Sequence, residues 1–355
     1  MKIILPTYIL TPDRLLQNHG VAFEREILKV APIDELQAEF SHAQTEYLPK
    51  GSLLMPGLIN AHVHIEFSAN KTTLNYGDFI PWLYSVIEHR ESLINGCDAA
   101  CMDKAIDEML RCGVTSFGAI SSHAMDLAAC EKAKQNVVFF NELIGSQAAM
   151  ADALYNDFLG RLEASKSVTR EGFHAAIAIH SPYSVHPILI KKALNLAKHE
   201  RLRLTAHFME SQAEKEWLES NQGDFKEFFE KLLKQNSSLT TPGEFLESFE
   251  GIKTLLTHAT KADDEALKKI AHSGHTIAHC PISNRLLGNG TLDIAKLDAL
   301  GIDWVVATDG LSSNYKLDLF EEMKVALFMH SHMPLASFAQ SLLESVTLRA
   351  AKTLG

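Results

Sequence analysis

Two histidines with one residue between them, His62 and His64, are the residues whose types and spacing most directly suggest metal chemistry in this chain. They close an apolar run, and residues i and i+2 of a strand point to the same face, so both imidazoles could reach one ion. Neutral imidazole is a favoured ligand of Zn²⁺ and Fe²⁺. A lone His-x-His pair arises easily by chance, but a place at the end of a barrel strand favours the metal site.

Later apolar runs end in residues that could complete such a site: His207, followed by Glu210, and then Asp309. Three histidines and one aspartate around one ion leave a place for water, as a hydrolytic metal requires. Water bound there loses its proton near neutral pH and becomes a nucleophile. Glu210 is placed to carry that proton to the substrate as general base and then acid. The alternatives are a surface carboxylate for Glu210 and a helix N-cap for Asp309.

Two more histidines, His258 and His180, also end apolar runs. His258 could be a further ligand or a hydrogen-bond partner of the attacking water. The second is favoured, because with four protein ligands the metal keeps one coordination position, which the water takes. His180 could polarise a substrate heteroatom or be a satisfied loop histidine. No lysine lies in 174–180, which argues against a carbamylated lysine between two metals. We therefore expect one divalent ion, Zn²⁺ or Fe²⁺.

The elements that must position these residues alternate along the chain, as is typical of βα units. Eight apolar runs are predicted as strands: 53–64, 114–120, 137–143, 174–180, 203–208, 253–258, 275–280 and 303–308. Amphipathic segments between them are predicted as helices: 99–111, 125–134, 187–200, 263–272, 293–300 and 317–329. This pattern predicts an α/β fold, a (β/α)₈ TIM barrel with catalytic groups at the C-terminal strand ends. A doubly wound sheet is the alternative, but its Gly-rich nucleotide turn is absent.

Two regions fall outside the alternation, so we expect a division of the chain. Residues 1–55 contain strand-like runs and are predicted to form a small β appendage, whereas 56–355 form the barrel. Residues 211–250 are a charged helical insertion, and the capping-box pattern from Thr241 to Glu244 predicts the start of its last helix. The insertion could be a lid over the C-terminal face or a solvated structural excursion.

Composition excludes several classes of partner. The net charge of −11 repels phosphate backbones, which argues against nucleic-acid binding. No apolar run approaches the roughly 20 residues of a membrane span, and the first residues lack the pattern of a secretory signal. The five cysteines include no C-x-x-C pair, which is typical of thiols in a reducing compartment. We expect a cytoplasmic protein, with a homo-oligomer left open.

Four stretches together resemble the amidohydrolase superfamily, specifically its single-metal deaminase and chlorohydrolase branch. They are PGLINAHVH (56–64), HFME (207–210), HCPISNRLL (279–287) and ATDGLSSNYKLDLFEEMK (307–324), in the family's order along essentially the whole chain. The resemblance implies a (β/α)₈ barrel whose N-terminal strands join a small β-sandwich. It also implies roles by position: His62, His64, His207 and Asp309 as metal ligands, Glu210 as proton shuttle, His258 and Asp309 as the groups acting on the attacking water, and His180 facing the substrate.

Within that branch, HVHIEFS (62–68), YGDFIPWL (76–83), FFNELIGS (139–146) and SNRLL (283–287) are similar to aminodeoxyfutalosine deaminases. The resemblance implies hydrolysis of the adenine 6-amino group of 6-amino-6-deoxyfutalosine, giving futalosine and ammonia on a route to menaquinone. That substrate carries a benzoate carboxylate, which Arg285 could bind in bidentate fashion or else pair with a neighbouring acid. Glu66 and Glu142 are further candidates for ribose or base contacts; either could instead be structural.

Other functions stay open within and beyond the same chemistry. The branch also includes adenosine, S-adenosylhomocysteine and guanine deaminases and triazine chlorohydrolases, whose shared core leaves the choice to pocket loops. A different class is a metal and nucleoside-binding protein without turnover, and a third is a scaffold. Family members usually continue past a segment like 345–355 with strands that complete the sandwich, so we expect those C-terminal strands to be missing here.

Overall fold

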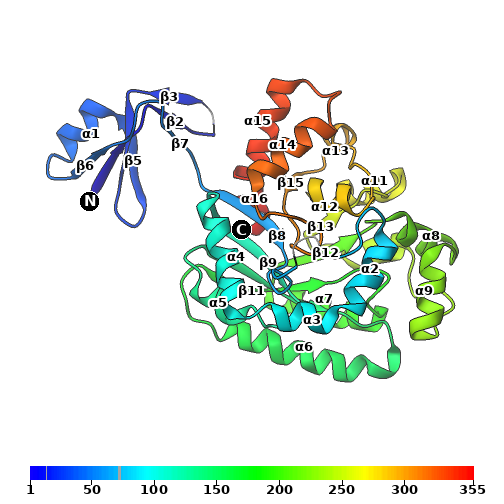
Figure 1. Ribbon diagram of the computed structural model, residues 1–355. Coiled ribbons are helices and arrows are strands. Elements are labelled where there is room, and N and C mark those ends of the chain that lie inside the picture. The colour runs from blue at the N-terminus through cyan, green and yellow to red at the C-terminus, as the bar shows by residue number, and fades with distance from the viewer. Residues whose placement is uncertain (13, 71–72) are drawn as a thin grey trace. The chain divides into compact units, whose positions relative to one another are not determined.

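The computed structural model describes residues 1–12, 14–70 and 73–355 (Figure 1). The chain divides into two compact units, Met1–Gly57 and Leu58–Gly355. Within the described residues, no helix combines the length and the apolar character that a membrane crossing demands.

The first unit is built from short strands with one helix packed on them. One sheet has the order β5-β4-β1-β6 and a second has the order β3-β2-β7. Leu36 of the helix packs with Ile3, Leu5 and Ala22 in a small apolar core of its own. The elements are β1 (Lys2–Leu5), β2 (Tyr8–Leu10), β3 (Leu15–Gln17), β4 (His19–Phe23), β5 (Ile27–Pro32), α1 (Ile33–Glu39), β6 (Gln44–Tyr47) and β7 (Leu53–Leu54).

The second unit contains an eight-stranded parallel sheet whose strands follow one another in chain order. They are β8 (Leu58–Val63), β9 (Val114–Ser121), β10 (Asn136–Leu143), β11 (Phe173–Ile179), β12 (Leu204–Phe208), β13 (Thr254–His258), β14 (Thr276–His279) and β15 (Trp304–Val306). The predicted (β/α)₈ barrel is therefore confirmed. One predicted strand, 53–64, is wrong as a single element: it contains both β7 and β8. Pro56 separates them, because proline has no N–H for a sheet ladder.

Contacts between β8 and the residues just after β15 bring the two edges of this sheet together. The Asp309 N–H donates to the His62 carbonyl over 3.2 Å. The Asn60 amide bridges to Thr308, donating to its hydroxyl over 2.7 Å and accepting its backbone N–H over 3.1 Å. Side-chain hydrogen bonds therefore replace part of the backbone hydrogen bonding between the two edges, next to the predicted metal ligands.

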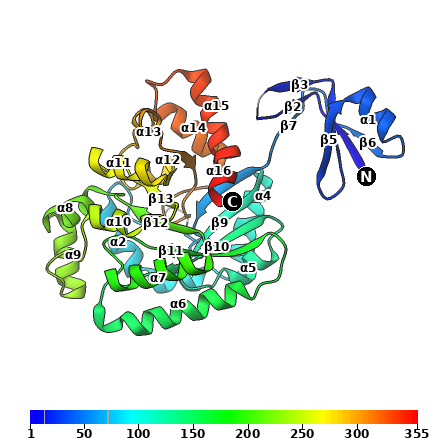
Figure 2. The same cartoon turned by 180° about the vertical axis from the view of Figure 1, so that it is seen from behind.

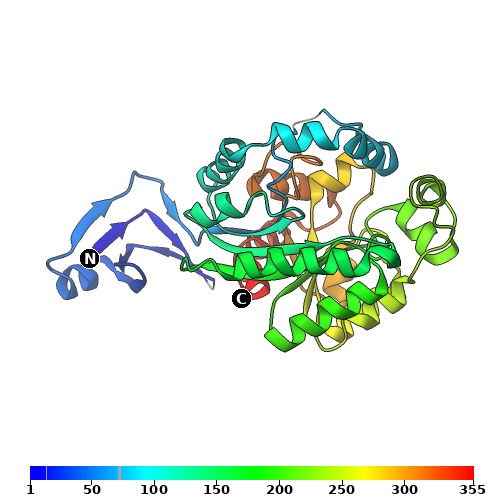
Figure 3. The same cartoon turned by 90° about the horizontal axis from the view of Figure 1, so that it is seen from below.

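Helices cover the outside of the barrel strands; α6 and α7, for example, pack on β10 and β11 (Figures 1 and 2). Figure 3 shows them around the strands from below. Their bounds are α2 (Phe79–Glu88), α3 (Arg90–Gly96), α4 (Ala99–Arg111), α5 (Leu127–Lys132), η1 (Ala148–Met150), α6 (Ala151–Lys166), α7 (Pro187–Glu200), α8 (Gln212–Ser220), α9 (Asp224–Leu233), α10 (Pro242–Ser248), α11 (Asp264–Ser273), α12 (Pro281–Leu286), α13 (Ile294–Leu300), α14 (Leu319–Met329), α15 (Leu335–Ser345) and α16 (Leu348–Leu354).

The six predicted helices are all present, with α4 and α7 matching residue for residue. The largest omission is α6, whose sixteen residues bury only Ala151, Phe158, Leu162 and Ser165. A stripe this narrow and partly polar produces little amphipathic periodicity in the sequence. Helix α6 is therefore held mainly by packing on the sheet, which the sequence pattern does not reveal.

The insertion 211–250 consists of α8, α9 and α10, and Thr241 and Glu244 form the predicted capping box. Its aromatic side chains are buried: Phe225 is in ring contact with Tyr183, with centroids 4.6 Å apart, and with Phe79 of α2 at 6.0 Å. Trp217 stacks on Phe229 at 5.0 Å. The insertion is thus packed through these rings against the loop that follows β11. Tyr183, which it contacts, is in turn in ring contact with His180, with centroids 5.9 Å apart.

Candidate active site

Three histidine rings converge at the carboxyl ends of β8 and β12. The ring centroid of His62 lies 5.0 Å from that of His64 and 4.9 Å from that of His207, while His64 and His207 are 5.5 Å apart. The Nε2 atoms of His62 and His64 lie 3.7 and 3.5 Å from Oδ1 of Asp309, just beyond β15. The structure therefore brings together all four residues that the sequence predicts as metal ligands.

Hydrogen bonds on the far side of two imidazoles leave their other nitrogens facing this centre. Nδ1 of His62 lies 3.2 Å from the Thr257 hydroxyl, and Nδ1 of His207 lies 2.9 Å from the His180 carbonyl. Nε2 of His62 is buried and has no hydrogen-bond partner among the described residues. An orphaned buried nitrogen costs about 1–3 kcal/mol, which a metal bond would offset. Three histidine nitrogens within 4.8 Å of one another fit a divalent ion.

Asp309 is held so that one carboxylate oxygen faces the histidines. Its Oδ2 accepts the hydroxyls of Ser283 and Ser313, each over 2.7 Å, and Oδ1 accepts the Gly310 N–H over 2.8 Å. Glycine is required at 310, since a Cβ there would lie 2.8 Å from Cβ of His64. Burial raises the pKa of Asp309, but the neighbouring imidazoles, that of His64 first, outweigh burial and hold the pKa below its usual range.

Two of the imidazoles at this centre, those of His62 and His207, are kept neutral. Burial, reinforced by the neighbouring histidines, holds the pKa of His62 and of His207 well below the ordinary value. A neutral imidazole keeps the lone pair that a metal ligand needs. The electrostatics and the geometry of this cluster therefore agree.

Glu210 and His258 lie beside the histidine cluster, with Glu210 Oε1 3.5 Å from His258 Nε2. Burial is the main cause that raises the pKa of Glu210 well above its ordinary value, and the charges of Asp309 and Glu214 add to it. The backbone N–H groups of Met209 and Glu210 donate to the Glu214 carboxylate over 3.0 and 2.7 Å, which fixes this turn. A buried carboxyl whose pKa is raised above its ordinary value suits proton transfer.

The predicted substrate-facing residues His180 and Glu142 lie together at the same end of the barrel. Their ligand atoms and those of His207 lie within 4.8 Å of one another. Glu142 Oε2 accepts the Ser122 hydroxyl over 2.5 Å, while Oε1 is buried with no hydrogen-bond partner among the described residues. That orphaned acceptor is available to a donor of a bound molecule.

Glu66 is placed differently, in a network that orders the loop after β9. Its carboxylate accepts the N–H groups of Ser122, His123 and Met125, at 2.8 to 3.2 Å. It is 1 % exposed, and its charge adds to burial in raising the pKa of Asp126. Both oxygens of Glu66 are occupied by backbone groups, so of the two roles left open by the sequence, the geometry favours the structural one.

Arg285 lies on α12, at the end of the barrel that carries the histidine cluster. Its side chain is exposed and forms no hydrogen bond or ion pair with the described residues. Three neighbours, Ser283, Asn284 and Asn289, contact the site directly, and the sequence reasoning gave none of them a role. Ser283 and Asn284 lie in the SNRLL stretch, which was noted only for its resemblance to the family. Uncharged side chains are not typical metal ligands or acid–base groups, so their residue type alone predicted no role.

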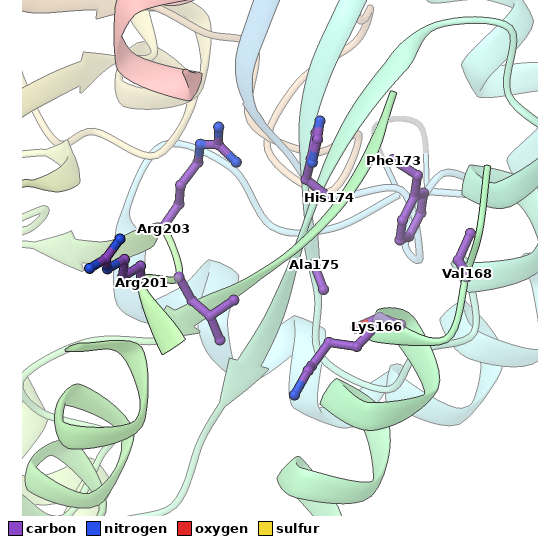
Figure 4. A pocket seen from close by; sticks show the side chains of 9 residues that line it. Lys166, Val168, Phe173, His174, Ala175, Arg201 and Arg203 are labelled. Carbon is purple, nitrogen blue, oxygen red and sulfur yellow. The ribbon is translucent and has the colours of Figure 1, made fainter. Parts of the chain in front are cut away.

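A hollow of about 340 Å³ also opens at the opposite end of the strands (Figure 4). Its lining comes from the end of α6 and the loop after it, the start of β11, and the three residues between α7 and β12: Ser165, Lys166, Val168, Phe173, His174, Ala175, Arg201, Leu202 and Arg203. None of the predicted site residues lines it. Since barrel enzymes carry their chemistry at the C-terminal strand ends, this hollow is not the candidate site.

Residues 53–355 match the Amidohydrolase family. The chain belongs to that family, which confirms the resemblance inferred from its motifs, and members of it are hydrolases that typically bind a metal. Among curated relatives, the aminodeoxyfutalosine deaminase of Nitratiruptor sp. is 47% identical over 355 residues, which cover 100% of this chain and 87% of the relative. An adenosine deaminase of Helicobacter pylori is 34% identical over 345 residues, covering 96% of this chain and 83% of that protein.

Solved structures agree with the sequence relatives. The crystal structure of Helicobacter pylori aminofutalosine deaminase in complex with methylthio-coformycin has a TM-score of 0.93 and 33% identity, covering 100% of this chain and 88% of that one. A guanine deaminase from C. acetobutylicum has a TM-score of 0.82 at 17% identity, a likeness that concerns the fold alone.

Proposed function

We propose that this protein is a metal-dependent hydrolase that removes the 6-amino group of an adenine nucleoside as ammonia. The observation that carries the proposal is the convergence of three histidines and Asp309 around one position, with the Glu210–His258 pair 3.5 Å apart beside them. A binding protein would need no proton carrier, so Glu210 favours turnover over binding alone.

His62, His64, His207 and Asp309 would hold one divalent ion, Zn²⁺ or Fe²⁺, which when bound lowers the pKa of a water molecule toward neutrality. His258 orients the attacking water, and Asp309 helps to take its proton. Glu210 accepts one proton of that water as general base and passes it to the purine ring nitrogen as the oxygen bonds to C6. The proton left on this oxygen is then carried by Glu210, with Asp309, to the amino group. The C6–N bond breaks, ammonia leaves, and the ring keeps the oxygen of water.

The proposed substrate is 6-amino-6-deoxyfutalosine, which would place the protein in menaquinone biosynthesis. The Nitratiruptor relative supports this choice by its name and its identity over the full chain. Buried Glu142 Oε1 and His180 are available to the nucleoside, and Glu66 would contribute through the loop it orders. Arg285, exposed and unpaired among the described residues, is available to the benzoate carboxylate. The free thiols support a cytoplasmic location, and the protein could act as a homo-oligomer.

Changing Arg285 to methionine should raise KM for aminodeoxyfutalosine by about 10- to 100-fold, the range of one lost charge-assisted hydrogen-bonding group. KM for adenosine, which has no carboxylate, should stay within about twofold. Steady-state kinetics on both substrates measure the effect, with Arg111→Met, an exposed arginine of α4, as the matched control. Equal changes for both substrates would remove Arg285 from substrate recognition.

Ammonia release from a panel of substrates tests the proposed function itself. The metal-loaded protein is assayed with aminodeoxyfutalosine, adenosine, S-adenosylhomocysteine, guanine and cytosine. We expect kcat/KM for the first to exceed the others by at least about 10², or roughly 3 kcal/mol of transition-state discrimination. A preference for adenosine would make the alternative activity, that of the named Helicobacter pylori relative, the correct one. Nucleoside binding without ammonia would instead indicate a binding protein.

A further inference from the structure

One short segment, from Ser283 to Asn289, supplies a hydrogen-bond partner to each of the three groups proposed to move protons. It comprises most of α12 and the turn that follows. Ser283 and Asn284 are fully buried and Asn289 is 2 % exposed. None of these three residues is charged, and none is within the set proposed to hold the metal.

The first partner is the Ser283 hydroxyl, which donates to Asp309 Oδ2 over 2.7 Å. The same hydroxyl lies 2.9 Å from the hydroxyl of Ser313, which donates to the same oxygen. Oδ2 is therefore fully occupied, and Oδ1 is the oxygen left to face the histidines.

The second partner is Asn284, whose Oδ1 accepts Nδ1–H of His258 over 2.9 Å. This bond places the imidazole proton on Nδ1, so Nε2 presents a lone pair toward Glu210. The Asn284 amide nitrogen points to Nδ1 of His279 at 3.5 Å, which fixes the orientation of the amide. Asn284 thus determines which tautomer of His258 faces the site.

The third partner is Asn289, whose Nδ2 donates to Glu210 Oε1 over 3.0 Å. Oε2 of Glu210 receives no hydrogen bond from the described residues. The backbone of Glu210 is held separately, by Glu214 at its N–H and by the Thr260 hydroxyl at its carbonyl over 2.6 Å. Within the described part of the chain, Asn289 thus supplies the hydrogen bond to the carboxylate itself, next to the 3.5 Å contact with His258, and its neutral amide orients the group without adding a charge.

The segment is itself rigidly anchored. The Ile282 N–H donates to the buried Glu322 carboxylate over 3.0 Å, and the Leu286 carbonyl accepts the Gly77 N–H over 2.7 Å. The backbone N–H of Asn289 donates to the backbone carbonyl of Asn284 over 2.9 Å, so the backbones of the two asparagines are fixed relative to each other.

We infer that three side chains of this one segment are positioning residues: Ser283 for Asp309, Asn284 for His258 and Asn289 for Glu210. Together they fix the positions of these three groups relative to one another. This inference rests on the proposed function, because it assumes that those three groups act in the reaction. A general acid or base must be held within a fraction of an ångström of its productive position. A single anchored segment achieves this for groups that come from three different strand ends.

The test replaces Asn289 with alanine and compares it with Thr291→Ala, an exposed control in the same turn. We expect Asn289→Ala to lower kcat by about 10- to 100-fold, as residues behind a reacting group commonly do, with KM within about threefold. The metal-to-protein ratio should not change. A crystal structure of the metal-free variant should show the Glu210 carboxylate turned away from His258 or in more than one rotamer.

A double-mutant cycle separates positioning from general stabilisation. If Asn289 acts through Glu210, adding Asn289→Ala to Glu210→Gln should change the residual turnover by less than about twofold. A full additional 10- to 100-fold loss, or an Asn289→Ala enzyme with unchanged kcat, would overturn the inference. Failure of the proposed function is distinguishable, because the unmodified protein would then release no ammonia from any nucleoside.

Discussion

Replacing Glu210 with glutamine is expected to lower kcat by about 10²- to 10⁴-fold, the usual contribution of one positioned acid–base group. The amide fills the same buried space and can still accept a hydrogen bond from Asn289, but it cannot take up and return a proton. Because Glu210 does not ligate the metal in our proposal, the variant should bind metal in the same ratio as the unmodified enzyme. Its affinity for the nucleoside should stay within about threefold, since the ground-state contacts remain.

Three measurements on purified protein check this result: ammonia release, metal content and nucleoside binding by calorimetry. The matched control is Glu219→Gln, an exposed carboxylate on α8 in the same insertion, which should leave kcat unchanged. A Glu210→Gln enzyme with more than about a tenth of full turnover would move the proton shuttle to another residue. Asp309, the other carboxylate that faces the histidines, would be the next candidate.

Replacing His64 with alanine should remove most of the bound metal and, with it, turnover. His64 Nε2 lies 3.5 Å from Asp309 Oδ1, so its loss opens the ligand set. We expect metal affinity to fall by more than about 100-fold, exceeding the 10- to 100-fold typical of residues behind the ligands. The effect should extend to stability, because an ion that binds only the native state raises the free energy of unfolding.

Thermal unfolding with and without added Zn²⁺ measures the second effect directly. At a metal concentration about 100 times its Kd, the unmodified protein gains about 2.7 kcal/mol; a 100-fold weaker site would gain only about 0.4 kcal/mol. The exposed His199→Gln variant on α7 is the control and should keep the full gain. Undiminished metal content and stabilisation in His64→Ala would contradict the proposed ligand set. The metal-free unmodified protein provides the baseline for both variants.

Much of the barrel could be predicted because its signals are local. Seven of the eight apolar runs each correspond to one strand, and turn residues bound them; the exception, 53–64, is interrupted by Pro56. Strand ends that carry a histidine or an aspartate stand out for the same reason, and parallel strands bring their carboxyl ends to one edge. His62, His207, His258 and Asp309 could therefore be placed near one another without coordinates. Helix α6 escaped prediction because its narrow buried face leaves only a weak periodic signal.

The sequence by itself determined the types of chemical group present and the barrel end at which they meet. Only the tertiary structure decided how each group is oriented, because the deciding hydrogen bonds join distant segments. Asn289 and Glu210 are 79 residues apart, and Glu66 lies 56 residues before the Ser122 N–H that occupies its carboxylate. Residue type and spacing carry no record of such partners. For this reason the sequence alone left a substrate role open for Glu66. It also predicted no role for Ser283, Asn284 and Asn289, whose contacts with the site appear only in the folded chain.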